Sequence, residues 1–336
     1  MTASRPLLRS LAAALVVAAG LAGCDHVTEP DGPRLIDQFG PFAVLEGLDA
    51  NRDSVRFPDN QSIVFTARFS KQVDWVIEIT GQESGAVKRI EGFSAEVSPE
   101  NARWAGGTTD LPLFKSEPVE AALFVPAESS DTLRTAIRVV EPREYAGAVF
   151  EDFEDDPDVF IGNFEFEFDL SATGVSSEVP AGQGDAFLLL RSRGGLPVVA
   201  DRFFLGLIDV RPPGGGVLEV PTTVPEDLYM NFFLRGFATD FTIPVVQLIV
   251  DGNGTGAYEI DQDIAIPFGD LTADFDGWQL VSAPLSELGV TEEQAGQIVG
   301  VRVLLITDAD AQPSPPLPVD FGIDYITFTA GGPFQP

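Results

Sequence analysis

Apolar and polar residues alternate in short runs along the first half of the chain. Runs of this kind span residues 62–69, 73–79 and 132–140, and turn-forming residues separate them at spacings of roughly ten residues. No long stretch repeats with the helical period of 3.6 residues. The pattern therefore predicts a β-sandwich over residues 37–141.

The second half continues the alternation with longer strands. Phe164, Phe166 and Phe168 alternate with acidic residues, and further apolar runs cover residues 186–191, 228–236, 245–251, 277–284, 299–307 and 322–329. The helical turn predicted here begins at Thr291, which is a good N-cap residue. Roughly eight strands and one short helix suit a jelly-roll β-sandwich, which we place at residues 148–330. The prediction is an all-β chain with two domains that divide between residues 141 and 147.

The first residues are typical of an export signal. Arg5 and Arg9 precede an apolar run from Leu11 to Leu21, which is too short to span a bilayer stably. The tetrad at 21–24, Leu-Ala-Gly-Cys, resembles the lipobox of bacterial lipoproteins, in which the cysteine thiol receives a diacylglycerol. We expect a signal peptide at 1–23, lipidation of Cys24, a tether at 24–36, and an exported protein anchored to the bacterial membrane, at the cell surface or facing the periplasm.

The chain is strongly acidic. It carries 52 Asp and Glu against 20 Lys and Arg, and without residues 1–23 the net charge is 18 − 52 = −34. This charge repels phosphate backbones and anionic headgroups, so we expect no nucleic-acid partner and contact with the membrane only through the lipid anchor. An excess of carboxylates with few lysines resembles the bias of salt-adapted bacteria; an ordinary acidic secreted protein is the alternative.

The residue inventory excludes several chemistries. His26 is the only histidine and Cys24 the only cysteine, so Ser-His-Asp triads, Cys-His dyads, zinc sites of His and Cys, and haem ligation by these residues are excluded. A glycosidase needs only two carboxylates, and Glu165, Glu167 and Asp169 would share one strand face. In so acidic a chain a solvated face is the simpler interpretation, and we predict that the protein is not an enzyme.

The first domain has a strand order with a known parallel. The runs at 75–79, 85–90, 102–107 and 119–125 together resemble the immunoglobulin-like module of flagellar hook-capping proteins, although Trp104-Ala105-Gly106 stands where that family usually has Trp-Asp-Gly. The resemblance implies an immunoglobulin-like β-sandwich that serves as a spacer or assembly unit.

The second domain carries three motifs in a fixed order, at residues 150–155, 276–288 and 321–328. Together they resemble the galactose-binding-like jelly roll of many carbohydrate-binding modules. The resemblance implies that the first and last strands pair and that acids on them share a structural calcium ion. The implied ligands are Glu151 and Asp324, with Asp152 as a third; an Asp324 that merely faces solvent is the alternative.

Sugar sites of such modules combine aromatic faces with side chains that hydrogen-bond hydroxyl groups. The candidates are Tyr229, Tyr258, Trp278 and Arg235, with Arg191, Arg193 and Gln247 as further polar groups; a core position for Trp278 is the alternative. We predict a lipoprotein that binds a neutral polysaccharide or oligosaccharide without cleaving it. A structural or protein-binding envelope lipoprotein and a glycoside hydrolase remain as alternatives.

Overall fold

The computed structural model describes residues 40–155, 157–161, 168–193, 204–307 and 317–336. The predicted signal peptide, Cys24, the whole tether at 24–36 and the acids Glu165 and Glu167 lie outside the described residues. None of the helices in these ranges combines the length and apolar character needed to cross a bilayer.

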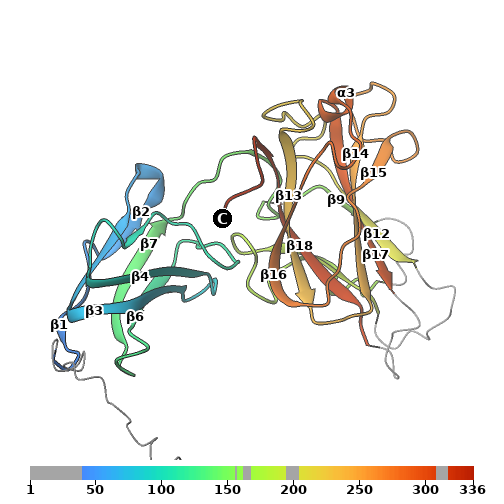
Figure 1. Ribbon diagram of the computed structural model, residues 1–336. Helices are drawn as coiled ribbons and strands as arrows, with labels where there is room; N and C mark the ends of the chain where they lie inside the picture. The colour runs from blue at the N-terminus through green and yellow to red at the C-terminus, as the bar shows by residue number, and fades with distance from the viewer. Residues whose placement is uncertain (1–39, 156, 162–167, 194–203, 308–316) are drawn as a thin grey trace, which may run out of the picture. The chain divides into compact units, whose positions relative to one another are not determined.

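The first seven strands form one hydrogen-bonded sheet in the order β1-β3-β6-β7-β2, with β4 and β5 also paired to β3 (Figure 1). Trp75, Trp104 and Phe65 are fully buried among them. A 3₁₀ turn, η1 (Phe57–Asp59), follows β2. The strands are β1 (Val44–Ala50), β2 (Ser54–Arg56), β3 (Ile63–Gly81), β4 (Val87–Val97), β5 (Arg103–Trp104), β6 (Pro118–Phe124) and β7 (Leu133–Glu141).

The long strand β3 replaces two strands that the sequence pattern separates. The alternation of apolar and polar residues in the sequence breaks at residues 70–72. In the structure every second side chain still points inward across this stretch, so Phe69, Lys71 and Val73 face the same side. Lys71 occupies the intervening inward position and forms an ion pair with Glu128, at 2.8 Å between Nζ and Oε1. The prediction of a break was wrong because a paired lysine can continue a strand whose alternation is intact.

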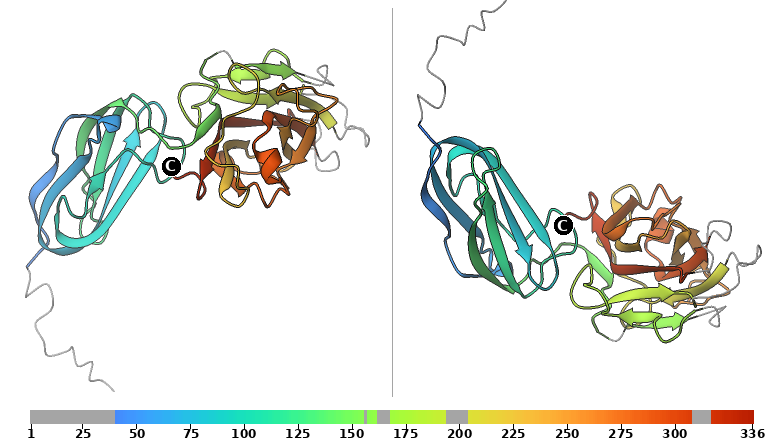
Figure 2. Two further views of the ribbon diagram at one scale, coloured as in Figure 1. Left: turned by 90° about the horizontal axis from the view of Figure 1, so that it is seen from above. Right: turned by 90° about the horizontal axis from the view of Figure 1, so that it is seen from below.

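The remaining strands form two sheets. We call these two the first sheet and the second sheet, and the sheet of β1 to β7 is not counted in this naming. The first sheet has the order β10-β11-β18-β13-β16, with β8 paired to β18. The second sheet has the order β15-β14-β17-β12-β9. Figure 2 views these sheets from above and from below. The strands are β8 (Ala148–Glu151), β9 (Val159–Ile161), β10 (Gly174–Ser176), β11 (Phe187–Arg191), β12 (Phe204–Val210), β13 (Leu228–Phe237), β14 (Thr242–Val250), β15 (Ile264–Pro267), β16 (Asp276–Pro284), β17 (Ile298–Thr307) and β18 (Asp320–Ala330).

The core of this second set of strands lies between the two sheets. Alternate side chains of β13, β14, β17 and β18 point into one apolar cluster that includes Phe232, Leu248, Val303 and Phe328. The predicted pairing of the first and last strands is confirmed, because β8 runs antiparallel to β18 with Glu151 opposite Ile326. The all-β prediction is confirmed as well.

The predicted helical turn is also confirmed. It is the short helix α3 (Glu292–Ala295), and the Thr291 hydroxyl accepts from the Gln294 backbone N–H while the Gln294 side chain accepts from the Thr291 N–H. This reciprocal capping box satisfies two backbone donors that a helix of four residues cannot pair internally.

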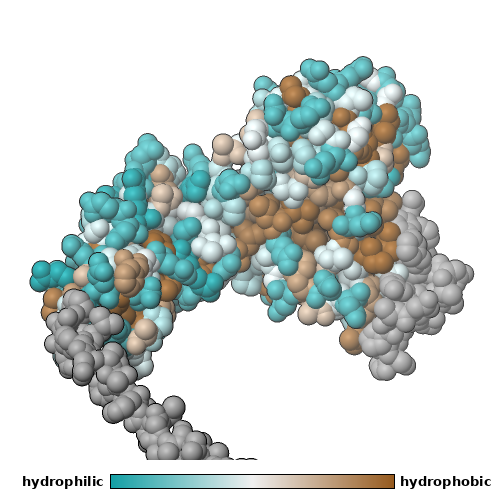
Figure 3. All heavy atoms as spheres, viewed as in Figure 1, coloured by the Kyte–Doolittle hydropathy of each residue, from teal (hydrophilic) through white to brown (hydrophobic). Residues whose placement is uncertain are grey.

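On the side of the molecule shown in Figure 3, apolar residues gather over the second set of strands more than over the first.

Candidate functional site

The predicted sugar-binding residues lie on both sheets of the second set of strands. Tyr229 and Arg235 point outward from β13, and Trp278 points outward from β16 directly opposite Arg235. These three therefore share the outer face of the first sheet. Gln247 lies on β14 of the second sheet, and Tyr258 lies in the segment that connects β14 to β15 of that sheet. The structure thus separates the four main candidates into two groups.

Trp278 lies beneath the segment that precedes β11. Its indole N–H donates to the carbonyl of Pro180 at 2.8 Å, and its ring meets Phe187 edge to face with centroids 5.2 Å apart. Ala181, Phe187 and Leu189 form a small buried cluster against it. The indole therefore holds this segment on the sheet, which is a core role and not that of a sugar platform.

The last residues of the chain cover the part of the same face near Tyr229. Asn231 accepts through Oδ1 from the Phe334 backbone N–H at 2.9 Å and from the Ser282 hydroxyl at 2.6 Å. The Phe334 ring packs against Phe233 at 5.7 Å between centroids. Tyr229 is half-buried beside this tail.

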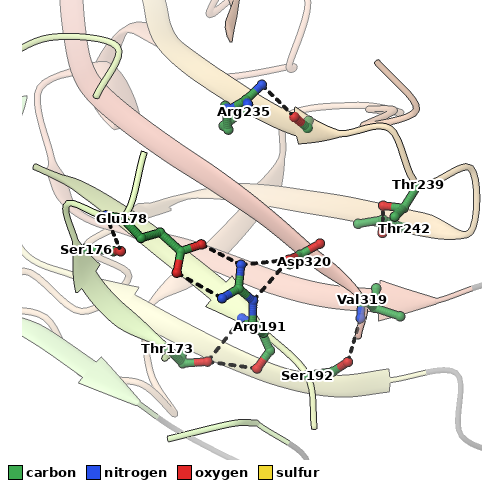
Figure 4. Close-up of polar contacts among 11 residues, drawn as sticks. Thr173, Ser176, Glu178, Arg191, Ser192, Arg235, Thr239, Thr242, Val319 and Asp320 are labelled. Atoms are coloured by element: carbon green, nitrogen blue, oxygen red, sulfur yellow. Dashed lines mark hydrogen bonds and ion pairs between the residues drawn. The ribbon is translucent and has the colours of Figure 1, made fainter. Parts of the chain in front are cut away.

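Arg191 on β11 and Arg235 on β13 form ion pairs on the first sheet (Figure 4). Arg191 binds Glu178 through both terminal nitrogens, at 3.0 and 2.6 Å, and Asp320 through Nε at 3.0 Å. Burial raises the pKa of Asp320, and the Arg191 charge opposes that rise. Arg235 binds Asp276 at 3.0 Å. Because Arg191 is so fully engaged, its primary role here is to tie β11 and β18 to the segment after β10.

The predicted calcium ligands hold backbone groups. One carboxylate oxygen of Glu151 accepts from the N–H groups of Asp152 and Phe153, at 3.1 and 2.8 Å. Asp324 has no exposed surface, and its two oxygens accept from Gln183 N at 2.8 Å and Tyr325 N at 2.7 Å. Burial raises the pKa of Asp324 well above its usual range.

Glu154, rather than Glu151, is the acidic neighbour that contributes to the pKa of Asp324. Glu154 accepts through Oε1 from the N–H groups of Asp185 and Ala186, at 2.8 and 2.9 Å, so both carboxylates bind the segment around Gln183. The side-chain oxygen of Gln183 is buried and has no hydrogen-bond partner. Within the described ranges no three His, Cys, Asp or Glu side chains gather as a metal site. A cation here would therefore need the amide oxygen of Gln183 in addition to carboxylates, and such hard oxygen donors suit calcium.

The second sheet carries a charged network on its outer face. Arg302 on β17 donates to Asp209 on β12 through Nε at 2.7 Å and Nη2 at 3.1 Å. The Tyr258 hydroxyl donates to Oδ2 of the same carboxylate and accepts from Arg302 Nη2 at 2.9 Å. Asp209 is only 1% exposed. Burial, reinforced by the hydrogen bond to Asp209, raises the pKa of the Tyr258 hydroxyl, which therefore stays protonated.

Arg211 and Gly300 complete the surroundings of Tyr258. A Cβ atom at Gly300 would lie 3.2 Å from Cδ2 of Tyr258, so the absence of a side chain at Gly300 makes room for the ring on the sheet. The Arg211 guanidinium lies 5.2 Å from the ring centroid, and its Nη1 donates to Asp158 at 3.3 Å. Arg211 Nε is buried without a hydrogen-bond partner; only it and the Gln183 oxygen have this status among the described side chains. The network therefore retains an unused donor.

Gln247 and an aliphatic pair continue this face. Gln247 lies directly opposite Arg302 across β14 and β17, and Val245 lies opposite Leu304 one outward position further along. All four side chains are half-buried. The Gln247 amide and the Nη1 group of Arg302 make no hydrogen bond within the described part of the chain. We call Gln247, Arg302, Val245 and Leu304, with Tyr258 and Arg211 beside them, the second-sheet site.

Sequence reasoning missed Asp209 and Arg302, although a signal for them was present. Each is the one charged residue of an otherwise apolar strand, in β12 and β17 respectively. Opposite charges isolated in apolar strands are rarely buried unless they pair. Arg193, a further candidate, is exposed just after β11.

Comparison with known proteins finds similar folds only. No protein-family model and no curated protein matches the chain. Among solved structures, a family 30 carbohydrate-binding module matches at 17% identity and a TM-score of 0.38, covering 56% of this chain and 90% of that one. A family 11 module from Clostridium thermocellum in complex with a β-1,3-1,4-mixed-linked tetrasaccharide matches at 15% and 0.30, covering 56% and 98%. A xylan-binding domain from Paenibacillus barcinonensis matches at 11% and 0.32, again covering 56% and 98%.

Proposed function

We propose that this chain binds neutral carbohydrate without cleaving it, through the second-sheet site. The observation that carries the proposal is the pairing of unused hydrogen-bonding groups with half-buried aliphatic side chains on one outer sheet face. The outer face of the first sheet is covered by its own segments around Ala181 and Phe334. Among the described residues, no such apolar cluster lies over the second-sheet site.

The chemistry of the site suits a sugar. Gln247 and Arg302 supply groups that can bond hydroxyls, and Val245 and Leu304 offer apolar surface to sugar C–H groups. The Asp209 carboxylate fixes Arg302 in place before any ligand arrives, which lowers the ordering cost of binding. Asp209 itself is buried and engaged, so it is not free to act as an acid or a base. These features support recognition rather than hydrolysis.

Replacing Gln247 by alanine tests this proposal. We expect the affinity for a bound β-glucan, xylan or mannan to fall about threefold to tenfold, because one or two hydrogen bonds to neutral hydroxyls are lost. The measurement is affinity electrophoresis or calorimetry of the full chain against a panel of these polysaccharides.

The matched control is Gln279→Ala. Gln279 is exposed on β16 of the first sheet and should leave binding unchanged. Equal losses in both variants would contradict the placement of the site. An absence of binding across the whole panel would favour the structural or protein-binding alternative, and release of reducing sugar would favour the hydrolase.

We also propose that the protein is exported and anchored through a lipid on Cys24. The support is the Leu21-Ala22-Gly23-Cys24 tetrad after a short apolar run. The strands β1 to β7 then serve as a spacer between the lipid and the binding strands. Anchored copies would also bind a polymer jointly, and this avidity offsets a modest affinity for each site.

We propose a structural calcium ion beside Asp324. The support is the carboxylate with no exposed surface, the neighbouring Glu154 and the unpaired Gln183 oxygen. A bound calcium ion would neutralise the buried charge and connect β18 to the segment before β11. Glu151 and Asp152, the ligands implied by family resemblance, are replaced in this proposal by Glu154 and Gln183.

Calcium is expected to raise the melting temperature of the full chain by about 5 °C at a concentration far above its dissociation constant, because it binds only the folded state. Glu154→Gln should reduce the shift, whereas Glu151→Gln should preserve it. The measurement is thermal unfolding in calcium, in magnesium and in chelator. If chelator and calcium give the same melting temperature, the ion has no site here.

A further inference from the structure

The hydrogen-bonding groups left unused in the second-sheet site are mainly donors. Arg302 keeps both hydrogens on Nη1. Gln247 adds two amide hydrogens and one acceptor oxygen. The acceptor that could balance them, the Asp209 carboxylate, is already bound by Arg302 and Tyr258.

A ligand that fits this surplus must present acceptors. A sugar hydroxyl accepts hydrogen bonds but must also donate one hydrogen. The site has few free acceptor atoms, so a ligand with hydroxyl groups alone would leave some of its own hydrogens unpaired. A carbonyl oxygen accepts two hydrogen bonds and donates none. A carboxylate would accept as well, but the chain carries a net charge of −32, which repels polyanions.

Apolar surface lies next to the donors. Val245 and Leu304 form the outward pair two residues along β14 and β17 from Gln247 and Arg302, a displacement of roughly 7 Å. Both side chains are half-buried and sit on the same face as the donors. A carbonyl with a methyl group attached would bond the donors through oxygen and place the methyl on the aliphatic pair.

We infer that the second-sheet site selects acetylated neutral glycans, with the acetyl carbonyl accepting from Gln247 and Arg302 and the acetyl methyl packing on Val245 and Leu304. The inference rests on the proposed function, since it names the glycan class that the same site takes. The acetyl group can come from an N-acetyl sugar or from an O-acetyl ester, and both present the same carbonyl and methyl.

The test compares pairs of saccharides in which one member carries the acetyl group and the other carries a hydroxyl at the same position. Chitotetraose and cellotetraose differ at the 2-acetamido group, and acetylated xylan and the same xylan after alkaline deacetylation differ at the ester. Calorimetry with the full chain should show roughly tenfold tighter binding of at least one acetylated member than of its unacetylated partner. The pair that shows the difference identifies the source of the acetyl group.

Gln247→Glu sharpens the test, because it keeps the shape of the side chain while replacing the amide donors by a carboxylate. In this variant the acetylated and unacetylated members of a pair should bind with about equal affinity. Gln279→Glu adds the same charge on the first sheet and should leave the preference intact.

The outcomes separate this inference from the proposed function. Equal affinity within both pairs would overturn the acetyl preference and leave carbohydrate binding standing. Tighter binding of oligogalacturonate than of any acetylated ligand would show that the acceptor is a carboxylate, which also overturns it. If none of the saccharides binds, the proposed function falls and the inference falls with it.

Discussion

Replacing Arg302 by methionine is expected to destabilise the second set of strands by about 3–5 kcal/mol. Asp209 is 1% exposed and receives two hydrogen bonds from the Arg302 guanidinium. Methionine keeps the length and apolar stem of arginine but leaves the buried carboxylate with only the Tyr258 hydroxyl as a side-chain partner. The cost is that of an uncompensated buried charge.

For a domain of this size, the loss corresponds to a fall in melting temperature of about 6–20 °C. The measurement is thermal and urea unfolding of the full chain, followed by circular dichroism. The double variant Arg302→Met with Asp209→Leu should recover much of the loss, because replacing both members of a buried ion pair by apolar residues is often neutral.

Arg211→Met is the matched control. Arg211 also contacts Tyr258, but it is partly exposed and its ion pair with Asp158 is long at 3.3 Å. Pairs of this kind contribute about 1 kcal/mol or less. Similar losses in Arg302→Met and Arg211→Met would mean that the Asp209 carboxylate is not held as the network implies.

Replacing Cys24 by alanine is expected to abolish membrane anchoring. Cys24 is the only cysteine of the chain, so no other thiol can accept a diacylglycerol. The protein should move from the detergent phase to the aqueous phase, or remain as an unprocessed precursor. Phase partitioning and the mass of the processed chain measure both effects.

Ser10→Ala provides the control for that experiment, since Ser10 lies in the proposed signal peptide but outside the tetrad at residues 21–24. This variant should be processed and anchored like the native protein. A Cys24→Ala protein that is still processed and anchored would rule out lipidation at this residue.

Much of the fold could be predicted from local patterns. The alternation of Phe65, Ala67 and Phe69 with polar neighbours, for example, already predicts a strand with one buried face, since successive side chains of a strand point to opposite sides. The capping residue Thr291 likewise predicts its helix from a span of four residues. The pairing of β8 with β18 followed from family resemblance rather than from any local pattern.

The candidate site could be predicted only in part. Tyr258 and Gln247 were identified by residue type, but the same reasoning also selected Trp278, whose indole is engaged with Pro180. The residue type determines which groups a side chain can bind. The fold determines whether another segment of the same chain already occupies that side chain. For Trp278 the covering segment lies 98 residues away along the chain.

The sequence by itself determined that this protein is built of strands, because β structure is dictated by an alternation that spans only a few residues. The tertiary structure alone decided which charged groups meet. Asp209 stands 93 residues from Arg302 and 49 from Tyr258. The register of β12 against β17 places Asp209 opposite Arg302, and the segment between β14 and β15 brings Tyr258 to both. Contacts over such separations depend on how the strands pair and twist, and no local pattern encodes that choice for a single pair of side chains.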